Sequence, residues 1–128
     1  WLVRRFIDPD APFRFIPGKT CPLAPSEVRF DMFDGEFTHE GNRCTFEVLC
    51  TRLGLDAPGV AAIGELIHDL DLKDGRFGRP EAAGLGALLS GIATLCPDDD
   101  DRVIRGGEVL DALRAHLARQ PRVGRSNP

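Results

Sequence analysis

Residues 80–96 read “PEAAGLGALLSGIATLC”, a run that is apolar almost all the way round a helix. Pro80 suits the first turn of a helix, because the N–H that proline lacks would have no partner there. A helix without a polar face is typical of a buried position. We therefore expect this helix to be the most buried in the chain, with Gly84, Gly86 and Gly91 allowing its neighbours to approach closely.

Amphipathic helices are predicted on both sides of this run. Residues 45–53 carry apolar side chains at i, i+3, i+4 and i+7, with Thr45 as the expected N-cap and Gly54 as the expected end. Residues 57–72 repeat the pattern, and a last helix begins at the aspartates of 98–101, where the helix dipole favours negative charge. The side chains expected to be buried are Phe46, Leu49, Cys50 and Leu53 on the first helix, Val60, Ile63, Ile67 and Leu70 on the second, and Val103, Leu110, Leu113 and Leu117 on the last.

Short strands are predicted in the N-terminal third of the chain. The runs 12–17 (“PFRFIP”), 27–33 (“EVRFDMF”) and 36–39 (“EFTH”) alternate apolar and polar side chains between turn residues. The predicted fold class is therefore α+β, with a few short N-terminal strands packed against a helix-rich C-terminal half of about four helices. We expect one domain over residues 1–119 and a flexible C-terminal tail over 120–128.

The composition excludes several classes of protein. With 42% hydrophobic and 28% charged residues, the 128-residue chain is globular rather than disordered. A net charge of -4 argues against direct binding of nucleic acid. No membrane-length apolar run and no signal-peptide pattern occur. The four cysteines lack C-x-x-C spacing, which favours a reducing, cytoplasmic setting.

The first candidate for chemistry lies in residues 35–44, “GEFTHEGNRC”. On a strand, Phe37 and His39 would share a face, so His39 is expected to point inward or to line a cleft. Either it is a core histidine bonded to a backbone carbonyl, or it is a metal ligand or acid–base group. In the second case, Glu36 and Glu40 are available oxygen ligands.

The second candidate lies in the helix predicted over 57–72. Glu65 and His68 are three residues apart, and Glu-x-x-His can bind a transition metal, although a solvated helix end explains the same residues. If folding brings His39 and His68 to one cavity, imidazole and carboxylate ligands there would suit iron, manganese or zinc. The predicted metal ligands are His39, His68, Glu36, Glu40, Glu65 and Asp69.

The third candidate is the loop in residues 73–84, “KDGRFGRPEAAG”, which runs into the N-terminus of a helix. Free backbone N–H groups at such an end attract anions. Arg76 and Arg79, joined by Arg43, could bind a tetrahedral oxyanion. Alternatively, the arginines of this loop could pair with Asp69, Asp71, Asp74 or Glu81. The sequence contains no Walker or dinucleotide-binding pattern and no nucleophile elbow.

Four segments together resemble a known family. They are 1–17, 35–47 (“GEFTHEGNRCTFE”), 67–85 (“IHDLDLKDGRFGRPEAAGL”) and 106–117 (“GGEVLDALRAHL”). In this order they are similar to the ChrB-type domain of the chromate-resistance protein family. The resemblance implies a bacterial cytoplasmic domain tied to chromate resistance, often fused or linked to a DNA-binding or a rhodanese-like module. It supplies no settled catalytic residues.

Three functions follow as expectations. The first is a sensor or regulatory domain that binds a metal ion, or chromate or a similar small oxyanion. The alternative is a metal-dependent redox or detoxification enzyme acting on chromate or its by-products, which could include a thiol route through Cys44 at the start of a helix. A third is a homodimerisation domain that uses helix 80–96. The patterns favour a binding domain over an enzyme.

Overall fold

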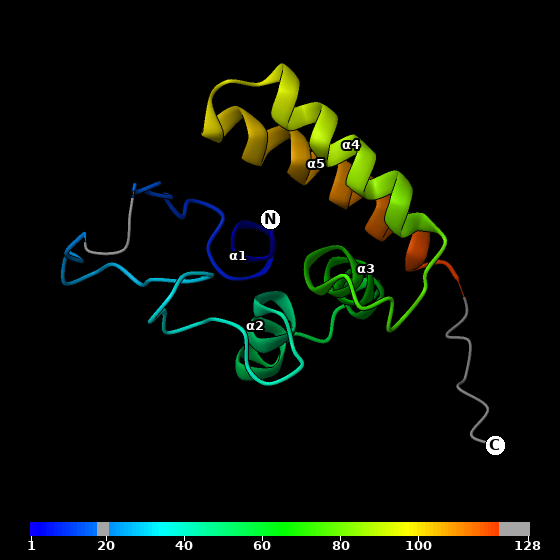
Figure 1. Ribbon diagram of the computed structural model, residues 1–128, viewed down its shortest axis with the longest axis horizontal. Coiled ribbons are helices and arrows are strands. Elements are labelled where there is room, and N and C mark those ends of the chain that lie inside the picture. The colour runs from blue at the N-terminus through cyan, green and yellow to red at the C-terminus, as the bar shows by residue number, and fades with distance from the viewer. Residues whose placement is uncertain (18–20, 121–128) are drawn as a thin grey trace.

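The structure is a computed structural model that describes residues 1–17 and 21–120. In this part of the chain the regular structure is helical (Figure 1). The helices are α1 (Leu2–Phe6), α2 (Thr45–Leu53), α3 (Val60–Leu72), α4 (Glu81–Leu95) and α5 (Asp99–Leu117). No helix in the described residues combines the length and the apolar character that crossing a bilayer requires.

Helix α3 is the centre of the fold. It packs against α2, α4 and α5, and α4 and α5 lie side by side as a hairpin (Figure 1). The main core cluster consists of Ile63, Leu66, Leu85, Leu110 and Leu117. A smaller cluster, made of Leu2, Leu49 and Val60, joins α1 to α2 and the start of α3. Burial of these side chains is the main favourable contribution to the stability of the helical layer.

The predicted α+β class is wrong. Between residues 7 and 44 the described chain is irregular, and its only pairings are two isolated bridges, Phe30 with Phe37 and Glu40 with Arg43. Asp31 interrupts the second predicted strand with a positive φ angle of 52°, and Asp34, with a φ of 57°, lies in the turn between the second and third predicted strands. A strand cannot continue through such residues.

The alternating pattern that suggested strands does not mark a buried face. Phe15 and Phe30 are 53% and 39% exposed, so these two aromatic side chains do not pack in a core, whereas Phe37 is partly buried against the smaller core cluster. Phe13 and Phe30 instead contact each other edge to face. Local clusters of this kind hold the irregular segment, and they require no sheet.

The prediction that residues 80–96 form the most buried helix is also wrong. Leu85 is the buried residue of α4, whereas Leu88 and Leu95 are 57% and 76% exposed. The helix lies on the outside of the layer, and its main contacts are with α3 and α5 (Figure 1). Of its glycines, Gly86 makes a close approach: a Cβ there would lie 3.0 Å from Cδ2 of Leu70.

The positions of the other predicted helices are largely confirmed, but Leu53 of α2, which was expected to be buried, is 41% exposed. Gly54 ends α2 in the left-handed conformation, and the carboxylate of Asp98 caps α5 by accepting two backbone N–H bonds. The N-cap of α2 is Cys44, one residue before the predicted Thr45. On α3, His68 is buried, while Ile67 and Leu70 are only half-buried. The tail predicted from residue 120 lies, apart from Gln120, outside the described residues.

Candidate functional site

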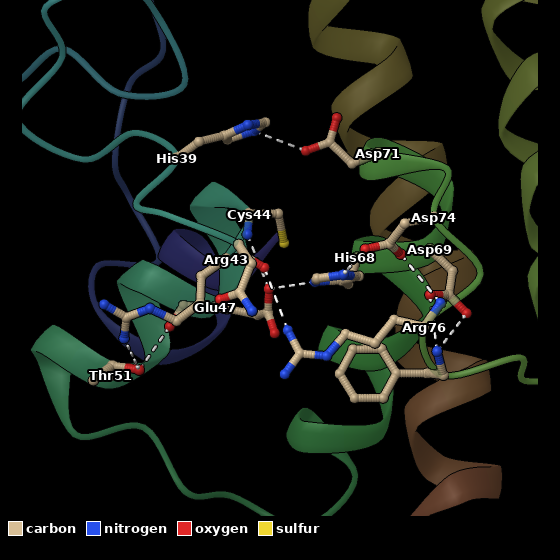
Figure 2. Close-up of polar contacts among 12 residues, drawn as sticks. His39, Arg43, Cys44, Glu47, Thr51, His68, Asp69, Asp71, Asp74 and Arg76 are labelled. Atoms are coloured by element: carbon tan, nitrogen blue, oxygen red, sulfur yellow. Dashed lines mark hydrogen bonds and ion pairs between the residues drawn. The ribbon is translucent and has the colours of Figure 1, made fainter.

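His68 is completely buried on α3 and lies between two carboxylates (Figure 2). Its Nδ1 is 2.7 Å from Oε2 of Glu47, and its Nε2 is 3.1 Å from Oδ2 of Asp74. The ring of Phe77 meets the imidazole edge to face at 5.0 Å between centroids. A buried imidazole with a carboxylate at each nitrogen is an unusual arrangement for a side chain that only fills space.

Cys44 and Glu47 are placed by the N-terminus of α2. The two residues form a capping box, in which the Glu47 carboxylate accepts the backbone N–H of Cys44 at 2.9 Å and the Cys44 side chain faces the backbone N–H of Glu47. This arrangement satisfies N–H groups that a helix start leaves free. It also brings the sulfur of Cys44 to the side of His68, as Figure 2 shows.

The burial and charge of the cluster shift the acid–base properties of its members. Burial by itself would lower the pKa of His68, but the bonds to Glu47 and Asp74 outweigh that effect and raise it. The pKa of Glu47 is lowered, because its bonds to His68 and to Cys44 N–H outweigh burial. Burial raises the pKa of Cys44 to about 11, so its thiol keeps its proton. The carboxylates of Glu47 and Asp74 therefore favour the protonated form of His68.

A second imidazole group lies at the surface. Nε2 of His39 is 2.9 Å from Asp71 on α3 and 3.7 Å from Asp31, and the His39 side chain is 42% exposed. Asp31 also accepts the hydroxyl of Thr45 at 2.7 Å. Both histidines lie near the C-terminal half of α3, but each has its own carboxylate partners (Figure 2).

A cleft between α2 and α3 adjoins the buried cluster. Glu47 lines this cleft and also contacts His68, so the cleft borders one side of the cluster. Its lining combines apolar side chains, such as Phe46 and Val60, with the charged side chains of Arg43 and Glu65.

Comparison with known proteins confirms the family resemblance that the four sequence segments indicated. The family model described as “ChrB, C-terminal domain” matches residues 1–117. The chain belongs to this family. Protein ChrB of Cupriavidus metallidurans is 41% identical over 122 residues, which is 92% of this chain and 36% of that protein. The chain thus spans about a third of that relative's length, and no solved structure matches it significantly. Family membership confirms the expected association with chromate resistance.

In this ChrB domain, some of the predicted metal ligands have other partners. Glu40 pairs with Arg43 and Arg52, and Glu65 pairs with Arg79 at 3.0 Å. Among the described residues, neither of these acids nor Glu36 belongs to a group that could hold an ion with a histidine.

Asp69 has backbone partners of its own but also lies close to His68. Its carboxylate accepts the backbone N–H groups of Phe77 and Gly78, which shapes the loop after α3. One of its oxygens also lies within 4.8 Å of ligand atoms of His68 and Asp74.

The predicted oxyanion ligands of the ChrB domain differ in their surroundings. Arg43 bonds to Glu40 at 2.9 Å and Arg79 to Glu65 at 3.0 Å, neither of which was predicted; of the acids that the alternative named, Glu81 pairs with Arg79 at 3.6 Å. Arg76 makes no ion pair within the described residues. Its guanidinium lies 5.4 Å from the Phe77 ring centre, and it donates to the carbonyl of Asn42 at 3.5 Å.

Four residues of the two imidazole groups were not among the predicted ligands, namely Asp31, Glu47, Asp71 and Asp74, and Cys44 was considered only for a thiol route. For Glu47 the sequence carried no standard pattern, because a capping box begins with Ser or Thr and position 44 is Cys. Asp74 stands in an Asp-Gly turn, and only the tertiary structure brings it to His68.

Proposed function

We propose that this ChrB domain is the ion-sensing, regulatory part of a chromate-resistance protein, and that it binds a transition-metal cation around His68. The observation that supports this most directly is the buried imidazole with carboxylates at both nitrogens and a thiol beside it. Imidazole and carboxylate donors gathered in this way suit iron, manganese or zinc, and a sulfur donor favours zinc or iron among them.

A cation is favoured over an oxyanion by the charges around the cluster. A chromate-like anion near His68 would meet the carboxylates of Glu47 and Asp74. Arg43 and Arg79 already pair with acids, which leaves Arg76 as the predicted arginine without an ion pair in the described part of the chain. One guanidinium stacked near a ring gives little basis for selecting a dianion.

A regulatory role is favoured over redox catalysis by the state of the thiol. Cysteine acts as a nucleophile and reductant through its thiolate. The pKa of Cys44, raised to about 11 by burial, keeps that form scarce at neutral pH. The domain would pass its signal to a neighbouring DNA-binding or rhodanese-like module in a cytoplasmic protein.

Metal analysis of protein purified without chelators tests this function. We expect about one equivalent of a transition metal in the wild type and its loss in His68→Gln. His116→Gln is a matched control, because His116 is exposed on α5 and bonds to Gln120. No metal in the wild type, with none taken up on titration, would refute the proposal.

Two further measurements separate the alternatives. Chromate binding that weakens in Arg76→Ala, in protein that takes up no metal, would favour the oxyanion. Steady reduction of chromate by the metal-loaded domain would favour the enzyme.

A further inference from the structure

We propose that Cys44 completes the cation site, so that its Sγ, the Glu47 carboxylate and Nδ1 of His68 form a sulfur–oxygen–nitrogen set selective for Zn²⁺ and chemically similar ions. This inference rests on the proposed function and names the ligands and the ion class of the same site. The three donor atoms lie within 4.8 Å of one another. Cys44 and His68 are both fully buried, and Glu47 is half-buried.

The positions of the sulfur and oxygen donors are fixed by the start of α2. Cys44 has the extended backbone of an N-cap, with φ -74° and ψ 165°, and its capping box with Glu47 fixes both side chains. The third donor comes from α3, which packs against α2 through Val60 and Leu49. The set therefore joins two helices whose relative position is already determined by apolar packing, as a preorganised site requires.

Asp74 determines which nitrogen of His68 would meet the ion. Its carboxylate bonds to Nε2, and it is itself oriented by accepting the backbone N–H of Arg76 at 3.1 Å. Histidines that bind metals commonly donate their other N–H to a carboxylate in this way, which fixes the tautomer and strengthens the ligand. Nδ1 is then the metal-facing atom, on the side where Cys44 and Glu47 lie.

The chemistry of the set selects the ion. A thiolate and an imidazole with one carboxylate suit Zn²⁺ or Co²⁺, which form tetrahedral sites with mixed ligands. Mg²⁺ and Ca²⁺ prefer oxygen ligands and would gain little from the sulfur. Binding replaces the thiol proton and the Nδ1 proton by the metal, and both protons leave to solvent. The fourth position would open toward the cleft that Glu47 lines.

The second group, Asp31, His39 and Asp71, is different in kind. All three residues are exposed or nearly so, and the group has no sulfur. A hydrogen-bonded ion pair at the surface accounts for its geometry.

Titration of the whole chain with Co²⁺ tests the role of Cys44. Binding should produce a sulfur-to-cobalt charge-transfer band in the near ultraviolet, and Cys44→Ser should abolish it. Cys50→Ser is the matched control, since Cys50 is on the same helix and burial raises its pKa to about 11 as well. Serine is a good N-cap, so Cys44→Ser should keep α2 folded, which circular dichroism verifies.

Affinity for Zn²⁺ gives a second readout. Mutation of a residue that only hydrogen-bonds to a metal ligand weakens metal binding by ~10-fold or more. Loss of a direct ligand should cost at least as much, so we expect Cys44→Ser to bind Zn²⁺ at least about 10-fold more weakly. Asp74→Asn should weaken binding while keeping the charge-transfer band.

The outcomes separate this inference from the function on which it rests. If Co²⁺ binds in a manner that requires His68 but gives no sulfur band, or if Cys44→Ser keeps the band and the affinity, Cys44 is not a ligand and the proposed function stands. If the wild type binds no Co²⁺ and no Zn²⁺, both proposals fail.

Discussion

Replacing Glu47 with Gln should destabilise the chelator-treated domain by about 1–2 kcal/mol at pH 6. The Glu47 carboxylate accepts Nδ1–H of the buried His68 at 2.7 Å and the backbone N–H of Cys44 at 2.9 Å. A hydrogen bond to a charged group contributes ~1.5–3 kcal/mol and a neutral one ~0.5–1.5 kcal/mol. Gln keeps the shape of Glu and one acceptor oxygen, so the lost stability reflects mainly the missing negative charge.

Urea denaturation measures this effect. With a slope of roughly 1.5 kcal/mol per molar urea, the midpoint should fall by about 1 M. Glu40→Gln is the matched control. Glu40 pairs with Arg43 and Arg52 at the surface, and exposed pairs contribute ~0–1 kcal/mol. We expect the control to shift the midpoint by less than half as much.

Two results would refute the reasoning. Equal shifts for the two variants would mean that the bond between His68 and Glu47 carries no charge assistance. In protein that already carries His68→Gln, the loss of unfolding free energy caused by Glu47→Gln should largely disappear. If the full loss persists there, Glu47 stabilises the fold only by accepting the backbone N–H of Cys44, and the reasoning is refuted.

Three further predictions concern stability, each for protein treated with chelator. Leu66→Ala, in the core, should cost about 2–5 kcal/mol, whereas Leu88→Ala, on the exposed face of α4, should cost less than ~0.5 kcal/mol in thermal melting. Stability should fall as pH drops below 4.5, because Glu47 has a lowered pKa in the fold and contributes stability only while ionised. It should also fall as pH rises through the raised pKa of His68, whose contribution is full below its ordinary value of 6.5; melting temperature against pH measures both effects. Gly59→Ala should destabilise by more than ~1 kcal/mol in urea, because φ is +80° and a Cβ would lie 2.8 Å from a carbonyl oxygen of α5. Similar melting temperatures for the two leucine variants, a flat pH profile, or an unchanged glycine variant would each contradict the corresponding prediction.

Helix-forming segments were predictable because their physical causes are local. The i, i+3, i+4 spacing, the Asp98 cap and the left-handed Gly54 are all visible in the sequence and are all present in the fold. Burial of α4 was not predictable, because composition does not say how many neighbours a helix has. The strands failed for a related reason: alternation in runs of a few residues, such as 27–33, arises without a sheet when the aromatic side chains pack on one another.

The candidate site was likewise predictable only in part. His68 could be singled out from the sequence as a residue beside an apolar stripe. Its partners come from the start of α2 and from the turn after α3, and no pattern within one segment connects Glu47 and Asp74 to it. His39 was expected to point inward on a strand; with no strand there, nothing requires that orientation, and the side chain is 42% exposed.

The stability of the domain and the occupancy of the proposed site are separable in this fold. The core of Ile63, Leu66 and Leu85 is built from helix faces that do not include the donor atoms, so the helices can pack without the ion. A cation at His68 must displace the proton that Glu47 now accepts, which lowers its affinity relative to a set of bare ligands. Because the proton and the cation compete for His68, the occupied fraction of the site depends on the concentration of the ion. A ligand whose binding is not needed for folding can bind and leave without unfolding the domain, as the proposed sensing role requires.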